Sequence, residues 1–512
     1  MKFNLIGLIL LATLSSHAAE KFKVSIHSTD IKIQSSQKEN AFTHVSVDGT
    51  ESEKTVGAPE LPVKSWLVQA KPEQIKVQFK SFKTEKLSNI KPYPVQEQDC
   101  RCAQDQIKTF KVNNKFYAQP MNSVNIDYLG SYRGIPVSRV DVRLGQYNSE
   151  TNEVEIVTDG DVTINMPLFT YPQTERNSYL IVSPLELVDG LTAFTEWKRS
   201  QGYTVHVETV TSPSNDLNAI QALIKKYYDE HSIDFAIIVG DENTIPMFRV
   251  STSGSYQTPS DLKYFTMDGA DDYIPDVLAS RIVATSVEQV TAQLAKSIEF
   301  EQRAFQDASG LRRFIGIASN EGSNPSDNQY ITSIGDRHKE VNGSEVLHYY
   351  QNDRENSNPA GLNRGLNTGA AWLTYMGHGS GTSWDNLNQT YYVRHIPEMR
   401  NQTVVKPIII DVACQNGRLL SRYLGTSFMN PTGEAAGAAA YYGGTVNISW
   451  HPPAVMAQGI AFQHLEKKFK HLGEALMAGQ MYLASRWNNK TQIIDNMEWY
   501  HLQGDPGLNI QF

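Results

Sequence analysis

Cysteine, an excess of positive charge and long apolar runs are all scarce in this 512-residue sequence. Its 46 Lys and Arg are outnumbered by 55 Asp and Glu, and the net charge of −9 is spread without a basic stripe. That balance argues against a nucleic-acid partner. No stretch approaches the ~20 consecutive apolar residues that a membrane-spanning helix needs. Charged residues at 20% and hydrophobic residues at 40% are typical of a globular chain.

The N-terminus carries an export signature. One lysine precedes an apolar run from Leu5 to Leu14, and Ser16 and Ala18 are the small residues that a signal peptidase prefers just before its cleavage point. The run is too short to cross a bilayer comfortably. We therefore predict a cleavable signal peptide over residues 1–18 and a secreted or periplasmic protein.

The three cysteines do not form a disulfide framework. Cys100 and Cys102 flank one arginine in "DCRC", a spacing too close for an easy low-strain disulfide but not an impossible one. Two surface thiols or a local disulfide are favoured over half of a metal site, because no partner cluster stands nearby. Cys414 has no partner by spacing, which leaves an unpaired thiol in an exported protein.

The pattern of apolar residues changes along the chain. Residues 19–172 alternate apolar and polar side chains between turn-formers such as "NSETN", which predicts an all-β domain. From residue 173 buried strands alternate with helical segments, as in α/β proteins with mainly parallel sheets. We expect two α/β subdomains, 173–308 and 309–512. The polar segment 167–179 between the β-rich and α/β parts is predicted to be accessible to a protease.

Two buried strand-like runs end on potentially reactive side chains. "AWLTYMGHG" places His378 between two glycines, and "KPIIIDVAC" ends on Cys414. Sites in parallel α/β sheets form beyond the carboxyl ends of the strands, so neighbouring strands would bring both side chains into one crevice. An imidazole can deprotonate a thiol, and the thiolate is a nucleophile. The N–H groups of Gly379 and Cys414 could then stabilise an oxyanion, at about 3 kcal/mol per donor. The pattern favours acyl transfer over an inert buried cysteine and a plain loop histidine.

The segments "YMGHGSGTSW", "IIIDVACQNG" and "IASNEG" resemble the gingipain family of secreted cysteine peptidases, which has the caspase-like fold. "FAIIVGDENTIP", "VNISWHPP" and "HLQGDPGLNI" follow in the family's order and approximate spacing. "GAPELPVKSW" in the β-rich region resembles the start of the family's inhibitory prodomain. The resemblance covers nearly the whole chain after the signal peptide.

The resemblance implies a zymogen whose own prodomain is an inhibitory partner and whose substrates are proteins or peptides. His378 would be the general base and acid, and Cys414 the nucleophile that forms a thioester acyl-enzyme. Gly379 and Cys414 would supply the oxyanion-hole amides. Glu321 matches the family's third catalytic residue, which orients the imidazole; a solvated loop acid is the alternative. No cofactor is implied for the chemistry.

Substrate preference stays open at this stage. Trp450 matches an aromatic residue that walls the family's substrate pocket, although a core tryptophan is a fair alternative. The best-known members cleave after arginine or lysine by means of an acidic pocket residue. Asp327 is acidic but falls earlier than that residue, whose matching neighbourhood here is Ile331–Thr332. A basic and an uncharged preference are therefore equally defensible.

An Asp-rich loop suggests a structural calcium ion. Five aspartates crowd into residues 261–276, enough oxygens for a hard cation, and gingipain-type enzymes bind calcium in the corresponding region. Asp261 and Asp271 are the predicted ligands. The spacing is not that of an EF-hand, and helix caps and turns account for many aspartates.

Three functions remain in competition. The leading one is a secreted endopeptidase that is activated by a cut near Arg176. A transpeptidase would use the same acyl-enzyme with an amine acceptor. A non-catalytic exported binding protein would keep the fold alone. Rapid alkylation of Cys414 at neutral pH is expected of the enzymes and not of the binding protein.

Overall fold

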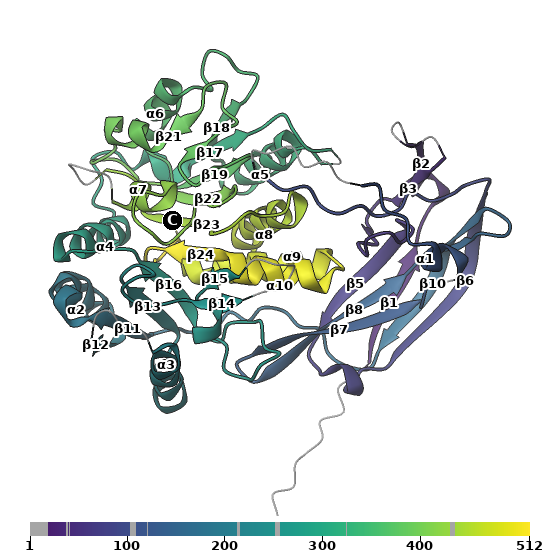
Figure 1. Cartoon of the computed structure of the whole chain (residues 1–512), viewed down its shortest axis with the longest axis horizontal. Coiled ribbons are helices and arrows are strands. Elements are labelled where there is room, and N and C mark those ends of the chain that lie inside the picture. Colours follow the sequence, from purple (N-terminus) through teal and green to yellow (C-terminus); the bar gives the residue numbers. More distant parts are fainter. Residues whose placement is uncertain are drawn as a thin grey trace, which may run out of the picture.

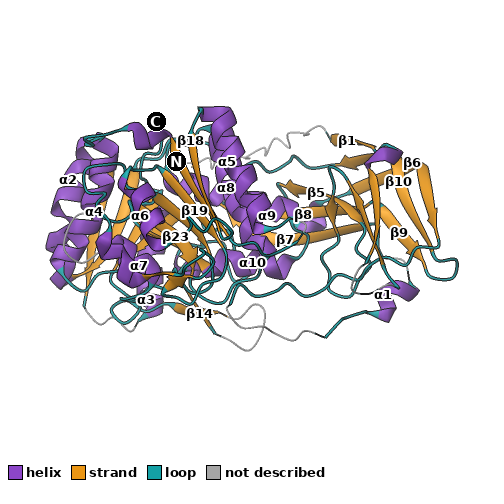
Figure 2. Ribbon diagram, turned by 90° about the horizontal axis from the view of Figure 1, so that it is seen from above, coloured by secondary structure: helices purple, strands orange, loops and turns teal. Residues whose placement is uncertain are grey.

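A computed structural model describes residues 19–511, except 37–38, 40, 103–108, 120, 212–215, 251–256, 324 and 431–435. The predicted signal peptide therefore lies outside the described residues. The chain forms a β module, residues 20–164, and an α/β module, residues 178–511 (Figure 1). Seen from above, the two modules lie end to end, with α9 and α10 nearest the β module (Figure 2).

The β module is built from antiparallel sheets. One has the order β1-β10-β6, with β9 also paired to β10, and another has the order β4-β5-β8-β7. Side chains of β10 alternate between core and surface, so Val154, Ile156, Val162 and Ile164 are all buried. The elements are β1 (Glu20–Ser25), β2 (Ile31–Ser35), β3 (Thr43–Val47), β4 (Glu51–Ser52), β5 (Pro62–Val68), β6 (Val77–Ser88), α1 (Asn114–Ala118), β7 (Val124–Tyr132), β8 (Ile135–Arg143), β9 (Gly145–Asn148) and β10 (Glu153–Ile164).

One ten-stranded sheet runs through the α/β module. Its order is β12-β11-β13-β16-β24-β23-β22-β19-β17-β18. In chain order these strands are β11 (Ser178–Pro184), β12 (Thr204–Val210), β13 (Phe235–Val239), β16 (Leu278–Ile282), β17 (Arg313–Ala318), β18 (Glu345–Tyr350), β19 (Trp372–Met376), β22 (Ile408–Val412), β23 (Ala440–Gly444) and β24 (Tyr500–Gln503). Two short pairs lie outside it, β14 (Phe248–Val250) with β15 (Thr258–Ser260), and β20 (Ser383–Trp384) with β21 (Tyr391–Tyr392).

The last strand joins the two halves of this sheet. Neighbouring strands are parallel except β24, which is antiparallel to β23 and meets β16 at one bridge between Arg281 and Gln503. The continuous sheet means that the two α/β halves are not separate sheets. The division at residue 308 stays a prediction.

Helices cover both faces of the sheet (Figure 1). Their starts follow capping rules: the Ser286 hydroxyl caps α4 and the Ser326 hydroxyl caps α5. They are α2 (Thr192–Ser200), α3 (Leu217–His231), α4 (Val287–Gln302), α5 (Asp327–Asn342), α6 (Pro359–Asn367), α7 (Leu424–Met429), α8 (His451–Lys467), α9 (Leu472–Arg486) and α10 (Lys490–Trp499). In the described part of the chain, none is long and apolar enough to cross a membrane.

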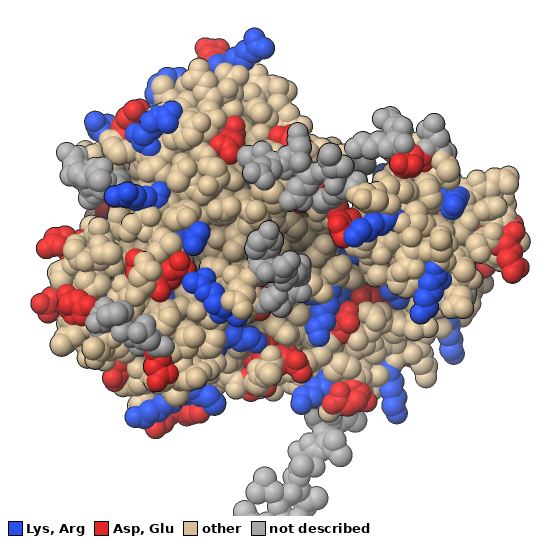
Figure 3. All heavy atoms as spheres, in the orientation of Figure 1, with Lys and Arg blue, Asp and Glu red and all other residues tan. Residues whose placement is uncertain are grey.

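The two modules are joined by buried polar contacts. The Arg139 guanidinium of β8 donates hydrogen bonds to the carbonyls of Ala484 and Trp487 at the end of α9. On the face shown in Figure 3, basic and acidic side chains are interspersed over both modules.

The connection between the modules corrects one prediction. Residues 173–175 are exposed, as are Thr170 and Asn177, whereas Arg176 is only 1% exposed. The Arg176 guanidinium pairs with Glu474 at 3.0 Å and donates to the Tyr132 hydroxyl at 2.5 Å. The segment 167–179 is thus not uniformly accessible, because burying an arginine requires ion-pair partners that hold the chain down.

Candidate functional site

His378 and Cys414 follow neighbouring strands. β19 and β22 pair in parallel, with Met376 opposite Val412. His378 and Cys414 each come two positions after this pair. All five residues of each strand are buried. The predicted adjacency of these strand ends is confirmed. A side chain at Gly379 would not fit, because its Cβ would lie 2.7 Å from the Cys414 carbonyl oxygen.

The imidazole of His378 is held by a carboxylate, which an amide holds in turn. Its Nε2 lies 2.9 Å from Oε2 of Glu321, and Asn386 donates to the other oxygen of Glu321 at 3.1 Å. This hydrogen bond raises the pKa of His378 and lowers the pKa of Glu321. Nδ1 of His378 is buried and has no hydrogen-bond partner among the described residues. With Nε2 engaged, Nδ1 is the nitrogen that remains for proton transfer.

The thiol of Cys414 is fully buried. Its Sγ accepts a hydrogen bond from the Ile448 N–H at 3.2 Å and lies 3.8 Å from Sγ of Cys100. Burial raises the pKa of Cys414 to about 12. No hydrogen bond joins Cys414 to His378 among the described residues. The rapid alkylation expected from the sequence therefore does not apply to this form of the protein.

A segment of the β module's chain, residues 99–102, lies across the site and is here called the strap. Arg101 N–H donates to the Ile448 carbonyl at 2.9 Å, and the Gly379 N–H donates to the Arg101 carbonyl at 3.4 Å. β-bridges join Cys100 to Ser449 and Cys102 to Gly379. The strap therefore binds as an added strand between the segment at Ile448–Ser449 and the loop at Gly379. No hydrogen bond from the Cys414 amide to the Arg101 carbonyl is found in the described part of the chain.

The side chain of Arg101 fills a pocket beside the site. It is 0% exposed and forms a bidentate pair with Asp327, at 2.9 and 2.7 Å. Its Nε donates to the Trp450 carbonyl at 2.9 Å, and the guanidinium lies 4.5 Å from the centre of the Trp450 ring. Burial opposes the charge, but Asp327 outweighs it and raises the pKa of Arg101. The pocket thus suits a planar cation.

The structure brings several of the residues predicted from the sequence together around the imidazole. Glu321, His378 and Trp450 lie together, with the Trp450 ring 5.3 Å from the imidazole. Asp327, placed too early by the motif spacing, is nevertheless at the base of the pocket as the first residue of α5. Sequence reasoning missed Asn386 and Arg101. The cysteines of "DCRC" gave no signal for this pocket, and the arginine between them is the residue that fills it.

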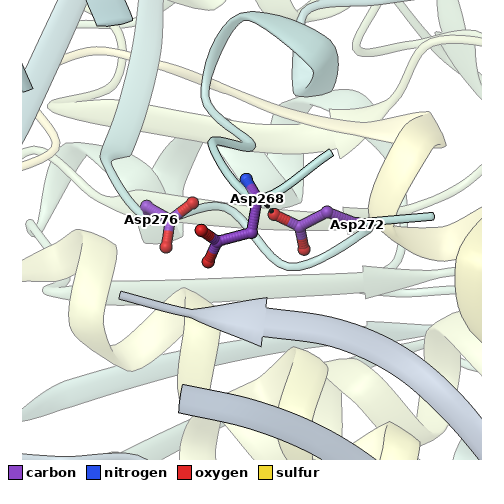
Figure 4. Close-up of side chains that lie close together, drawn as sticks. All are labelled: Asp268, Asp272 and Asp276. Atoms are coloured by element: carbon purple, nitrogen blue, oxygen red, sulfur yellow. Dashed lines mark hydrogen bonds between the residues drawn. The ribbon is translucent and has the colours of Figure 1, made fainter. Parts of the chain in front are cut away.

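The Asp-rich loop differs from the prediction. Asp261 is buried in a bidentate pair with Arg281, at 2.8 and 2.7 Å, and so has no free oxygen to offer a cation. The carboxylates that converge are instead those of Asp268, Asp272 and Asp276, with oxygens within 4.8 Å of one another (Figure 4). Asp271, the other predicted ligand, is not part of this group.

Backbone N–H groups of the β7–β8 turn cover these three carboxylates. Ser131 N–H donates to Asp272 at 3.0 Å, Arg133 N–H to Asp276 at 2.5 Å and Gly134 N–H to Asp268 at 3.2 Å. Burial raises the pKa of Asp272, and it raises that of Asp276 to about 7. Asp268, Asp272 and Asp276 have the oxygen chemistry of a hard-cation site, with the β module acting as part of its cover.

Comparison with known proteins places this geometry in a family. A family model described as Peptidase family C25 matches residues 173–511, and one described as Propeptide_C25 matches residues 11–181. Gingipain R2 of Porphyromonas gingivalis is 24% identical over 357 residues, which cover 66% of this chain and 46% of that protein. Lys-gingipain HG66 of the same species is 23% identical over 438 residues, which cover 74% of this chain and 25% of that protein. The chain thus spans less than half the length of these relatives.

Solved structures agree on the fold. The crystal structure of the Arg-specific cysteine proteinase gingipain R superposes with a TM-score of 0.59 at 21% identity, covering 67% of this chain and 80% of that one. The complex of pro- and mature domains from Porphyromonas gingivalis gives 0.57 at 21% identity, covering 65% and 79%. The predicted caspase-like α/β fold behind an all-β domain is confirmed. The chain belongs to peptidase family C25.

Proposed function

We propose that this chain is the zymogen of an exported cysteine endopeptidase that cleaves after basic residues, above all arginine. The observation that carries the proposal is the placement of Arg101. Its carbonyl accepts a hydrogen bond from the Gly379 N–H, and its guanidinium pairs with Asp327. A strap that binds in this way stands in for a substrate, with the carbonyl of Arg101 in the position of the scissile carbonyl.

The proposed chemistry is acyl transfer through Cys414. Once the strap leaves, water enters, the pKa of Cys414 falls, and Nδ1 of His378 takes the thiol proton. The thiolate attacks the substrate carbonyl carbon, and the Gly379 and Cys414 N–H groups stabilise the oxyanion. The imidazolium then protonates the leaving amine, which leaves a thioester on Cys414. Water activated by His378 hydrolyses the thioester.

The remaining residues position these groups. Glu321 holds Nε2 of the imidazole and stabilises the imidazolium, and Asn386 fixes Glu321 in turn. Asp327 and Trp450 form the pocket for the residue before the scissile bond. A bidentate carboxylate under an aromatic wall favours arginine over lysine, because lysine offers a point charge rather than a planar fork.

A peptide-library cleavage profile of the processed protein tests the proposal. We expect cleavage after arginine first and lysine second, with no cleavage by the processed Cys414→Ala variant. Mass spectrometry in the presence of an added amine distinguishes hydrolysis from amide formation. A profile dominated by uncharged residues before the cleaved bond would contradict the assigned pocket. Activity that persists in Cys414→Ala would contradict the nucleophile.

Removal of the Glu321 carboxylate is expected to change stability in a limited pH window. The pair contributes when Glu321 is ionised and His378 is protonated. The lowered Glu321 pKa means that its contribution is lost as pH falls below the ordinary 4.5, and the raised His378 pKa means that it is lost as pH rises beyond 6.5. Because the Glu321 side chain is 46% exposed, the loss is at most about 1 kcal/mol.

The measurement is urea unfolding of full-length Glu321→Gln and unsubstituted protein from pH 4 to pH 9. The difference in unfolding free energy should peak between the two ordinary pKa values, and the NMR-titrated pKa of His378 should fall in the variant. A difference that is constant across this range would show that the ion pair contributes nothing.

Calcium is expected at Asp268, Asp272 and Asp276 rather than at the ligands predicted from the sequence. Loss of the β7–β8 turn on processing would remove one N–H donor from each of the three carboxylates, and a divalent cation can replace these donors. Calcium should therefore raise the melting temperature of the processed protein by several degrees more than that of the full chain. Asp272→Asn should abolish this difference, whereas the neighbouring Asp271→Asn should keep it. Equal shifts in both variants would place any calcium elsewhere.

A further inference from the structure

The three cysteines of the chain meet at one place. Cys100 and Cys102 form a disulfide in the strap, and Cys414 comes from the end of β22, 314 positions after Cys100. Sγ of Cys414 lies 3.8 Å from Sγ of Cys100. A disulfide thus rests directly on the thiol that we assign as the nucleophile, although neither peptide cleavage nor pocket recognition requires sulfur in the strap.

We propose that Cys414 and the Cys100–Cys102 disulfide form a thiol–disulfide exchange site that ties the strap covalently to the nucleophile. The Cys414 thiolate attacks Sγ of Cys100, the bond between Cys100 and Cys102 breaks, and Cys102 leaves as a thiolate that takes up the proton lost by Cys414. One disulfide and one thiol are present before and after, so no oxidant is consumed. The regulatory meaning of this exchange rests on the proposed role of Cys414 in catalysis.

The surroundings direct the exchange to Cys100. Arg101 is fixed between the cysteines by Asp327, and the β-bridges to Ser449 and Gly379 hold the strap on both sides. The Ile448 N–H points at Sγ of Cys414 and the Cys102 N–H at Sγ of Cys100, at 3.2 and 3.1 Å. The first donor stabilises negative charge on the attacking sulfur, and the second fixes the position of the sulfur that is attacked.

Burial sets the pace of the reaction. The pKa of Cys414, raised to about 12, keeps the thiol protonated at neutral pH, so exchange in the closed form is slow. An exported chain meets oxidising conditions, where a disulfide persists until a thiol reductant arrives. A chain that has exchanged stays inactive after the β module is cut, because Cys414 is blocked. Activation then needs a reductant as well as a protease.

Disulfide mapping of the intact chain tests the exchange without reference to activity. The full-length protein is incubated without reductant at pH 8, quenched in acid, alkylated with N-ethylmaleimide under denaturing conditions and mapped by mass spectrometry. We expect a Cys100–Cys414 linkage with alkylated Cys102 to grow with time, while the total of one free thiol per chain stays constant. Alkylation confined to Cys414 at all times would overturn the proposal.

A matched pair of variants tests the geometry. Cys102→Ser keeps the sulfur that faces Cys414, and Cys100→Ser keeps the other one. In a buffer of oxidised and reduced glutathione, which supplies the oxidant, we expect Cys102→Ser to form the link to Cys414 about tenfold faster than Cys100→Ser. Equal melting temperatures would show that both variants fold alike. Equal linkage in the two variants, or linkage in neither, would overturn the assignment of Cys100 as the sulfur that Cys414 attacks.

The two hypotheses fail differently. A Cys100–Cys414 linkage in a protein that cleaves no peptide after processing and reduction would support the exchange and contradict the peptidase. Reductant-independent activity of the processed protein with no linkage would support the peptidase and contradict the exchange.

Discussion

The full-length Arg101→Ala variant is expected to cleave peptides after arginine before any part of the β module is removed. The substitution removes the guanidinium from the Trp450 ring and leaves the Asp327 carboxylate buried, with the Ser319 hydroxyl, at 2.7 Å, as its one remaining side-chain donor in the described part of the chain. Breaking a buried ion pair by removing one partner costs about 3–5 kcal/mol. At about 1.4 kcal/mol per tenfold change, the strap should hold the site about two to three and a half orders of magnitude less tightly.

The measurement is the initial rate of cleavage of an arginyl peptide by chains that a denaturing gel shows to be intact, in the presence of a thiol reductant. Arg101→Lys should be intermediate, since it keeps the charge but loses the planar fork. Lys83→Ala, at an exposed position of β6, is the control and should stay as latent as the unsubstituted protein. Latency of Arg101→Ala equal to that of the control would move the cause of inhibition from the pocket to the rest of the strap.

The local pattern of apolar residues was sufficient to predict the residues of the site that directly follow a single strand. The apolar runs before His378 and Cys414 are long enough to predict buried strands, and parallel strands bring their carboxyl ends to one edge of a sheet. The structure supplies the register, in which Met376 pairs with Val412. The expected oxyanion donor Gly379 likewise depends on a position directly after a strand.

The contacts that define the pocket could not be found in this way. Arg101 and Asp327 are 226 positions apart, and nothing in the periodicity around either residue encodes their meeting. The same holds for β24, which joins the two halves of the sheet although it comes last in the chain. Asp261 was misread because its partner Arg281 belongs to another element, and a paired carboxylate looks like a free one in sequence.

Replacement of Asp327 by asparagine is expected to separate arginine recognition from catalysis in the processed enzyme. Asparagine keeps the size of the side chain but removes the charge that neutralises a buried guanidinium. The kcat/KM for peptides cleaved after arginine should therefore fall by about two to three and a half orders of magnitude, from the same loss of about 3–5 kcal/mol. Peptides with an uncharged residue before the scissile bond should be affected little, because Cys414, His378 and Gly379 are unchanged.

The variant has a second expected effect that makes the test sharper. Asp327 also holds Arg101, so full-length Asp327→Asn should lose latency while its processed form loses arginine specificity, a combination that a folding defect does not produce. Asp336→Asn, at an exposed position on the same helix α5, is the matched control and should change neither property. If both variants kept the arginine preference, Asp327 would serve the zymogen alone, and recognition of substrate would depend on other groups around Trp450.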